Sequence, residues 1–350
     1  MVRTDACCEV AGQVKFWQMF PEESANIGIP GELVRAVERW GRITKGFADE
    51  FVMRAAFRPA FVSAEVSAVK CSNGHLRYLI AIGKRLYFFI WRTNMLVADY
   101  WKLDKNLAYV PKERGEPWPS RDILEEYAAA VEMYFGGKEL SGATFDKFNQ
   151  VVSDSHPAAQ LLYQQVVDMA ELFVLFHEFL HAAPPPPNLE VSFVPDLVGY
   201  DILKENRRAR WLDELNRDAN AINLLWIAAT DQLEKTLGLS MPDAKKAAAG
   251  LVFSGSIAAL NTLLELERIR HGEVSEERAA TDLEWRNHPP AELRTNLISQ
   301  FQQGLARVWL DEPTWQMIRE SVASMAHVRD DLFDGFLATN QDIVAGVRGD

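Results

Sequence analysis

The sequence has few positive charges for its size, few cysteines and no long uninterrupted hydrophobic run. It contains 37 lysine and arginine residues against 49 aspartate and glutamate residues, which gives a formal net charge of −12. A surface with this deficit of positive charge is poorly suited to neutralising the phosphates of nucleic acid. We therefore do not expect nucleic acid among the partners of this protein.

Three cysteines, Cys7, Cys8 and Cys71, are too few and too unevenly spaced to form a disulfide framework. Reduced thiols are typical of cytoplasmic proteins. The first ten residues also lack the uncharged apolar segment of a signal peptide, because Asp5 and Glu9 lie within them. The sequence therefore predicts a cytoplasmic location.

No hydrophobic run is long enough, without interruption, to favour a membrane span of about 20 residues. The longest candidate covers residues 247–266, but it contains Gly250, Gly255, Asn261 and Glu265. Small and polar residues in such a run are typical of a helix that packs closely inside a protein. We expect a buried helix here and no stable membrane insertion.

The length and composition are those of a folded protein with a large core. The chain has 350 residues, of which 48% are apolar, so neither disulfides nor metals are needed for folding. We predict the α+β class, with a small antiparallel sheet packed on a mainly helical body. The predicted parts are a helical region over 1–55, an antiparallel meander over 56–105 and a helical body over 106–350, with one continuous domain from about residue 30.

Between residues 57 and 101, apolar and polar side chains alternate, and valine, isoleucine, phenylalanine and tyrosine are frequent. This pattern indicates β-strands. Asn73-Gly74 favours a tight hairpin turn, and Gly83-Lys84 favours a second, weaker one. We therefore predict a meander of three or four strands in which residues 86–101 are extended.

Helical spacing dominates most of the remaining sequence. Ser120 is a suitable cap for a helix that runs to about residue 135. Pro157 suits the first turn of a helix that ends near His181, before the four prolines at 184–187. The other predicted helices cover 31–54, 203–237, 242–270, 290–310 and 314–337.

The most informative residues are His177-Glu178-Phe179-Leu180-His181. Side chains four residues apart on a helix lie on one face, about one turn apart, so the two imidazoles can reach one metal ion together. Glu178 lies about 100° around the helix from His177, where its carboxylate can hold a metal-bound water. With 7 histidines in 350 residues, chance produces this pattern in only about one such chain in a hundred.

The residues around this motif are almost all apolar, which predicts a buried helix. Two imidazoles and a carboxylate inside such a helix destabilise the fold by several kcal/mol unless they are paired or bind a metal. The alternative interpretation is a pair of core histidines satisfied by hydrogen bonds. We favour the metal site, in which a water occupies an open coordination position and has its pKa lowered toward about 7.

A third protein ligand is predicted on a downstream helix, where Glu214 and Asp218 are also four residues apart. One carboxylate can complete the metal site while the other accepts a hydrogen bond from the second ring nitrogen of a ligand histidine. We assign the first role to Glu214 and the second to Asp218. Asp213 is the alternative ligand, and a solvated acidic patch is the alternative for the whole pair.

The spacing of His177, Glu178, His181, Glu214 and Asp218 resembles that of the gluzincin metallopeptidases, of which thermolysin is a familiar member. The stretch RNHPPAELRTNLI resembles the His-Pro…Arg segment of the CAAX-prenyl endopeptidase and HtpX-type family. The resemblance covers about residues 157–297. Those peptidases are typically membrane-associated, whereas this chain has no convincing span, so we expect it to resemble soluble relatives or the cytosolic phage-exclusion peptidases of the Lit type more closely.

The resemblance implies a zinc ion on His177, His181 and Glu214, with Glu178 as general base. It also implies that His288 donates a hydrogen bond to the oxyanion and that Arg294 pairs with an acidic residue near the metal. A helix-capping role for His288 and a surface or ion-pair role for Arg294 are the alternatives.

Other residues have less support for a role in catalysis. Tyr200 is a rival oxyanion donor, and Cys7 or Cys8 is a conceivable inhibitory zinc ligand. The remaining histidines are predicted to be structural: His75, His156, His271 and His327.

These residues predict a cytoplasmic zinc-dependent endopeptidase that acts on a protein or peptide substrate. A strand of the predicted meander could pair with the substrate backbone, as edge strands do in zincin-type peptidases. The alternatives are a regulatory or scaffold protein with a structural zinc ion, and a zinc hydrolase of a non-peptide substrate. The sequence specifies neither the substrate nor the oligomeric state.

Overall fold

The computed structural model describes residues 64–70, 76–82, 84–104, 109–112, 117–136, 148–150, 155–182, 185, 187–195, 197, 200 and 203–349. The helix predicted over 31–54, the three cysteines and His75 lie outside the described residues. The proposed boundary at residue 55 therefore stays a prediction.

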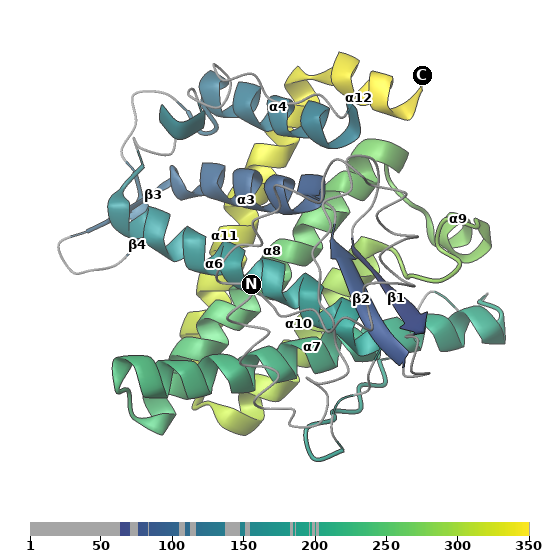
Figure 1. The fold of residues 1–350 in the computed structure, drawn as a ribbon. Helices are drawn as coiled ribbons and strands as arrows, with labels where there is room; N and C mark the ends of the chain where they lie inside the picture. The colour runs from purple at the N-terminus through teal and green to yellow at the C-terminus, as the bar shows by residue number, and fades with distance from the viewer. Residues whose placement is uncertain are drawn as a thin grey trace.

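The described residues are mostly helical, with a small antiparallel component, as the α+β prediction requires (Figure 1). The helices are α3 (Lys84–Ala98), α4 (Arg121–Gly136), α6 (Pro157–Ala182), α7 (Glu205–Leu237), α8 (Met241–His271), α9 (Glu276–Thr281), α10 (Ala291–Trp309), α11 (Glu312–Thr339) and α12 (Gln341–Arg348). The predicted helices from residue 120 onward are confirmed, with ends that differ by a few residues. The short helices α9 and α12 were not predicted.

Helix α8 is the central element, and it packs against α6, α7, α10 and α11. It begins after Ser240, whose hydroxyl accepts a hydrogen bond from the backbone of Asp243, and Pro242 lies in its first turn. Among the described helices it alone is long and apolar enough to cross a membrane, and 67% of its most apolar window is buried inside the protein. The prediction of a buried helix over 247–266 is thus confirmed.

The predicted hairpin is present as β1 (Ala64–Lys70) and β2 (Leu76–Ile82), which pair in antiparallel register from Ala64 opposite Ile82 to Lys70 opposite Leu76. Both strands pack against α6, the helix that carries the histidine motif (Figure 1). A second, very short hairpin joins β3 (Trp101–Leu103) and β4 (Tyr109–Pro111), which form a separate sheet.

The prediction of extended structure over 86–101 is wrong for residues 86–98, because residues 84–98 form α3, and is correct only for Trp101, which begins β3. The aromatic and β-branched residues there bury nearly the whole surface of this helix against α4 and α6, and burial of this extent overrides a local strand preference. Polar groups inside it are satisfied along the helix: Thr93 and Asn94 donate to the carbonyl oxygens four residues earlier, at 2.8 and 2.7 Å. Among the described residues, the predicted meander is therefore reduced to the hairpin of β1 and β2.

A second, smaller core lies under the N-terminal part of α7. Its centre is Trp211, which is fully buried and donates its indole N–H to the carbonyl oxygen of Trp285 at 2.8 Å. Leu203, Leu215 and Leu297 pack in the same cluster. This core attaches the segment before α10, which contains His288, to the first turns of α7.

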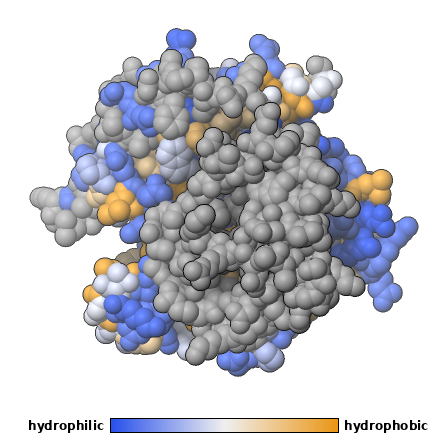
Figure 2. Space-filling view, in the orientation of Figure 1, coloured by the Kyte–Doolittle hydropathy of each residue, from blue (hydrophilic) through white to orange (hydrophobic). Residues whose placement is uncertain are grey.

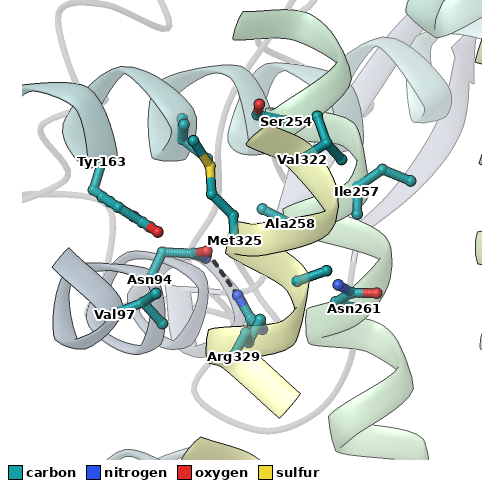
Figure 3. Close-up of a pocket in the computed structure, with 12 residues that line it drawn as sticks. Asn94, Val97, Tyr163, Ser254, Ile257, Ala258, Asn261, Val322, Met325 and Arg329 are labelled. Carbon is teal, nitrogen blue, oxygen red and sulfur yellow. Dashed lines mark hydrogen bonds between the residues drawn. The ribbon is translucent and has the colours of Figure 1, made fainter. Parts of the chain in front are cut away.

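A small pocket with a mostly apolar lining lies in the main core between α3, α6, α8 and α11 (Figure 3). Arg329 borders it and donates hydrogen bonds to Asn94 at 2.7 Å, Thr262 at 2.7 Å and both carboxylate oxygens of Glu265. Tyr127 also donates to Glu265, at 2.7 Å. These groups satisfy one another, so the cluster serves to join four helices.

The described surface is largely hydrophilic on the flank where α9 lies (Figure 2). Large apolar side chains that are exposed occur singly or in pairs on different elements, such as Leu161 on α6 and Leu283 after α9. Scattered exposure of this kind is ordinary in folded proteins.

The contact between α6 and α8 predicts opposite effects for two glycines of α8. A Cβ atom at Gly255 would overlap Met169 and lie 2.9 Å from the backbone nitrogen of Ala170, whereas Gly250 has nothing within 4 Å. We expect Gly255→Ala to lower the free energy of unfolding by about 1–3 kcal/mol. Gly250→Ala, the matched control, should raise it by about 0.5–1 kcal/mol through helix propensity alone. Urea denaturation of both variants measures the free energy of unfolding. Equal changes would show that the close contact of Gly255 with α6 does not restrict the size of the residue at this position.

Candidate metal centre

His177 and His181 lie one turn apart near the C-terminal end of α6, with their Nε2 atoms 3.2 Å from each other. Their rings are inclined at 73°, with centroids 5.1 Å apart. Aromatic and aliphatic side chains of the same helix, including Phe173, Phe176 and Leu180, are buried around them. The two ring nitrogens therefore converge on one point at the edge of an apolar environment.

Glu214 of α7 brings a carboxylate to the same point. Its Oε2 atom lies 3.2 Å from Nε2 of His177, and its Oε1 atom lies 3.4 Å from Nε2 of His181. The side chain of Glu214 is only 5% exposed. Of the described residues, these three form the group whose ligand atoms lie close enough together to hold a metal ion.

The spacing of the donor atoms fits a small divalent ion. Tetrahedral coordination with bonds of 2.0–2.1 Å places neighbouring ligand atoms about 3.3–3.4 Å apart. The two Nε2 atoms are 3.2 Å apart, and each faces a different oxygen of Glu214, at 3.2 Å from His177 to Oε2 and 3.4 Å from His181 to Oε1, which are distances close to that value. A tetrahedral ion held by two imidazoles and one carboxylate would keep a fourth coordination position for another ligand.

Asp218 lies one turn after Glu214 and is fully buried behind His177. Its Oδ1 atom is 2.8 Å from Nδ1 of His177. Arg294 of α10 donates two hydrogen bonds to the same carboxylate, at 2.9 and 2.8 Å. The structure thus brings Asp218 and Arg294 together as a bidentate pair against the rear of the first histidine.

These contacts determine the protonation of the cluster. Burial acts to lower the pKa of His177, but Asp218 and Glu214 outweigh it and raise the value to about 9. Burial and the neighbouring His177 lower the pKa of His181 to about 4. Despite burial, hydrogen bonds from His177 and His288 hold the pKa of Glu214 well below its usual range. Because a metal ligand must be a neutral imidazole, metal binding at neutral pH must release the proton of His177.

His288 lies in the segment before α10, and its Nδ1 atom is 2.8 Å from Oε2 of Glu214. The structure therefore places this histidine at the cluster, with its bond directed to the third candidate ligand. Exposure increases across the three imidazoles: the side chains of His177, His181 and His288 are 6%, 22% and 53% exposed. The cluster is consequently open to solvent on the side of His288.

Glu178 is half-buried on α6, next to His177 in sequence. Its charge contributes to raising the pKa of Arg294, which requires the two groups to be near each other. Tyr200 packs its ring against Trp211 at 5.3 Å. Among the described contacts of Tyr200, none is with the two histidines of α6 or with Glu214, so it is not brought to the cluster.

Arg217 is a member of the cluster that the sequence interpretation missed. It donates to Oε1 of Glu214 at 2.7 Å and to Asp213 at 2.5 Å. Asp213, the alternative ligand, is 60% exposed and directed to Arg217 instead of the histidines. The spacing of three and four residues on α7 was the available signal, since such pairs are neighbours on a helix.

Glu267 of α8 was also missed. It accepts hydrogen bonds from the indole of Trp285 at 2.6 Å and from the backbone nitrogen of Ala291 at 2.7 Å. The two donors bracket His288 in the sequence, so Glu267 holds both ends of the segment that carries it. No local pattern indicates this contact, because α8 and the segment meet only in the folded chain.

Comparison with known proteins does not add a relative. No family model matches the chain, and neither a curated protein nor a solved structure matches it.

Replacing the buried Arg294 should destabilise the protein more than replacing the partly exposed Arg217. Arg294→Met leaves Asp218 charged and fully buried, so we expect a loss of about 3–5 kcal/mol in the free energy of unfolding. Arg217→Met should cost no more than about 1 kcal/mol, because Arg217 is 21% exposed and pairs along its own helix. Urea denaturation in the presence of a chelator measures both. Equal losses would contradict the view that Asp218 depends on Arg294.

The two neighbouring acids of α7 should differ in their effect on metal content. Glu214→Ala removes a donor atom, so we expect the purified protein to lose stoichiometric metal on dialysis. Asp213→Ala, the matched control, should retain it, because Asp213 faces Arg217. Elemental analysis of the dialysed proteins measures the metal. Retention by Glu214→Ala together with loss by Asp213→Ala would exchange the two assignments.

Proposed function

We propose that the protein is a zinc-dependent endopeptidase of the gluzincin type, acting in the cytoplasm on a protein or peptide substrate. The observation that carries this proposal is the convergence of His177, His181 and Glu214, with Glu178 directly after the first histidine. The order and spacing of these residues resemble the gluzincin pattern noted in the sequence.

His177, His181 and Glu214 would hold the zinc ion. When bound, zinc supplies a Lewis acid that lowers the pKa of a coordinated water toward about 7 and polarises a carbonyl group. The mixture of imidazole and carboxylate donors suits zinc better than calcium or magnesium, which prefer oxygen ligands alone.

Glu178 acts as the base in this proposal. A carboxylate oxygen of Glu178 takes a proton from the attacking water as its oxygen bonds to the peptide carbonyl carbon. The same carboxylic acid then delivers the proton to the leaving nitrogen as the C–N bond breaks.

Asp218 and Arg294 position the site. The Asp218 carboxylate faces Nδ1 of His177 and thereby directs Nε2 toward the candidate metal position. Arg294 neutralises Asp218, so the pair adds little net charge to a buried region.

His288 is assigned to the oxyanion in this proposal. Its Nδ1 atom faces the carboxylate of Glu214 and must carry a proton there, so only Nε2 is free to face substrate. A hydrogen bond donated from this nitrogen would stabilise the negative charge that develops on the carbonyl oxygen.

The position of the hairpin supports the zincin-like interpretation of the fold. β1 and β2 pack against α6, and a strand beside the motif helix can pair with an extended substrate. Main-chain hydrogen bonds of this kind bind a peptide of almost any sequence.

Glu178→Gln tests the mechanism most directly. We expect the variant to keep bound zinc, because the side chain is not one of the three donors, and to lose peptide hydrolysis by at least about 100-fold. Glu171→Gln, the same change two turns earlier on α6, should leave both properties intact. Zinc analysis and mass spectrometry of new N-termini in a peptide library measure the two properties.

Full hydrolysis by Glu178→Gln would rule out the mechanism. Stoichiometric zinc with no cleavage by the unsubstituted protein would favour the scaffold alternative. Cleavage of small esters or amides but not of peptides would favour a hydrolase of another substrate.

A further inference from the structure

The face of α7 that carries Glu214 also carries arginines. Arg210, Glu214 and Arg217 are separated by four and three residues, so they lie on the same side of the helix. Arg210 is one turn, or about 6 Å, before Glu214 along the axis. It therefore lies next to the candidate metal centre.

Two arginines that contact the cluster, Arg217 and Arg294, have carboxylate partners. Arg217 donates to Asp213 and Glu214, and Arg294 donates twice to Asp218. The protein's own carboxylates pair with both guanidinium groups. Neither group is therefore available to bind a carboxylate of a ligand.

Arg210 differs from them. It is exposed, and its Nη1 atom donates to Oδ1 of Asn287 at 2.9 Å. Within the described part of the chain it makes no ion pair. Asn287 immediately precedes His288, the most exposed imidazole of the cluster. The hydrogen bond to Asn287 thus holds an unpaired guanidinium on the side where the cluster is open to solvent.

We propose that Arg210 binds a carboxylate group of the peptide substrate. The carboxylate is either an acidic side chain close to the cleaved bond or the C-terminal carboxylate, and the second source would make the enzyme a carboxypeptidase instead of an endopeptidase. This inference rests on the proposed peptidase function. A guanidinium has five N–H donors in a rigid fork, and the bond to Asn287 uses one of them. The Nε and Nη2 groups remain free to bind both oxygens of a carboxylate.

The overall charge of the protein makes a local cation necessary for such a substrate. A net charge of −12 repels an acidic peptide at long range. The positive charge of the exposed Arg210 attracts the acidic peptide beside the site and so offsets this repulsion locally. The hydrogen bond to Asn287 also restricts the side chain in advance, which reduces the entropy lost on binding.

Peptide binding to the zinc-loaded Glu178→Gln protein provides the test, because this form does not consume the probe. The probes are fluorescein-labelled decapeptides that carry one glutamate or one glutamine at each position in turn, each made as a C-terminal acid and as a C-terminal amide. Fluorescence anisotropy gives the dissociation constants. Added Arg210→Gln and Arg210→Glu substitutions complete the set.

We expect glutamate to bind about tenfold more tightly than glutamine at one position, or the acid about tenfold more tightly than the amide, which identifies the source of the carboxylate. Arg210→Gln should reduce this preference to less than about twofold, and Arg210→Glu should reverse it. Arg319→Glu is the matched control: it makes the same charge change on α11, an exposed position on another helix, and should keep the preference.

Two results would overturn the proposal. One is the absence of any preference for glutamate or for the free acid in the parent protein. The other is a preference that persists in Arg210→Gln while zinc content and melting temperature are unchanged, since Arg210 would then only join α7 to Asn287.

Cleavage of the same peptides by the unsubstituted protein separates this inference from the proposed function. A carboxylate preference that depends on Arg210, without any cleavage, would overturn the peptidase assignment and leave the binding site standing. Cleavage that does not distinguish glutamate from glutamine, or acid from amide, would leave the peptidase assignment standing and overturn the carboxylate site at Arg210.

Discussion

The arrangement of α6, α7 and α10 depends on a cluster of charged groups that none of these helices could bury alone. Asp218 is fully buried and faces His177 of one helix and Arg294 of another. A buried charge is tolerated only when partners of opposite charge surround it in good geometry. The three helices must therefore meet at this point, and their meeting brings the carboxylate of Glu214 to the two histidines.

The cluster has a closed side and an open side, and this asymmetry organises the proposed chemistry. Asp218 and Arg294 form the closed side, where packing fixes the first histidine. His288, Arg217 and Arg210 lie toward the open side, where the imidazoles become more exposed. Rigid support behind a ligand and access in front of it are the two conditions that a catalytic metal site must satisfy together.

Prediction from the sequence succeeded where the controlling interactions are local. Proline and capping residues set the ends of α6 and α8, and Asn73-Gly74 indicated the hairpin of β1 and β2. It failed for α3, whose aromatic residues have strand propensity but are buried on a helix by α4 and α6. Local preference is weak compared with burial on this scale, so only the folded chain decides such a segment.

The sequence by itself determined the pairs that lie on one helix: His177 with His181, and Glu214 with Asp218, because helical geometry fixes residues four apart. Tertiary structure alone decided what lies between elements. His288 meets Glu214 across 74 positions of the chain, and Arg294 meets Asp218 across 76. The choice between Glu214 and Asp213 as the acid that faces the histidines, and the position of Arg210 beside Asn287, depend on the packing of whole helices, and no spacing within a single segment encodes that packing.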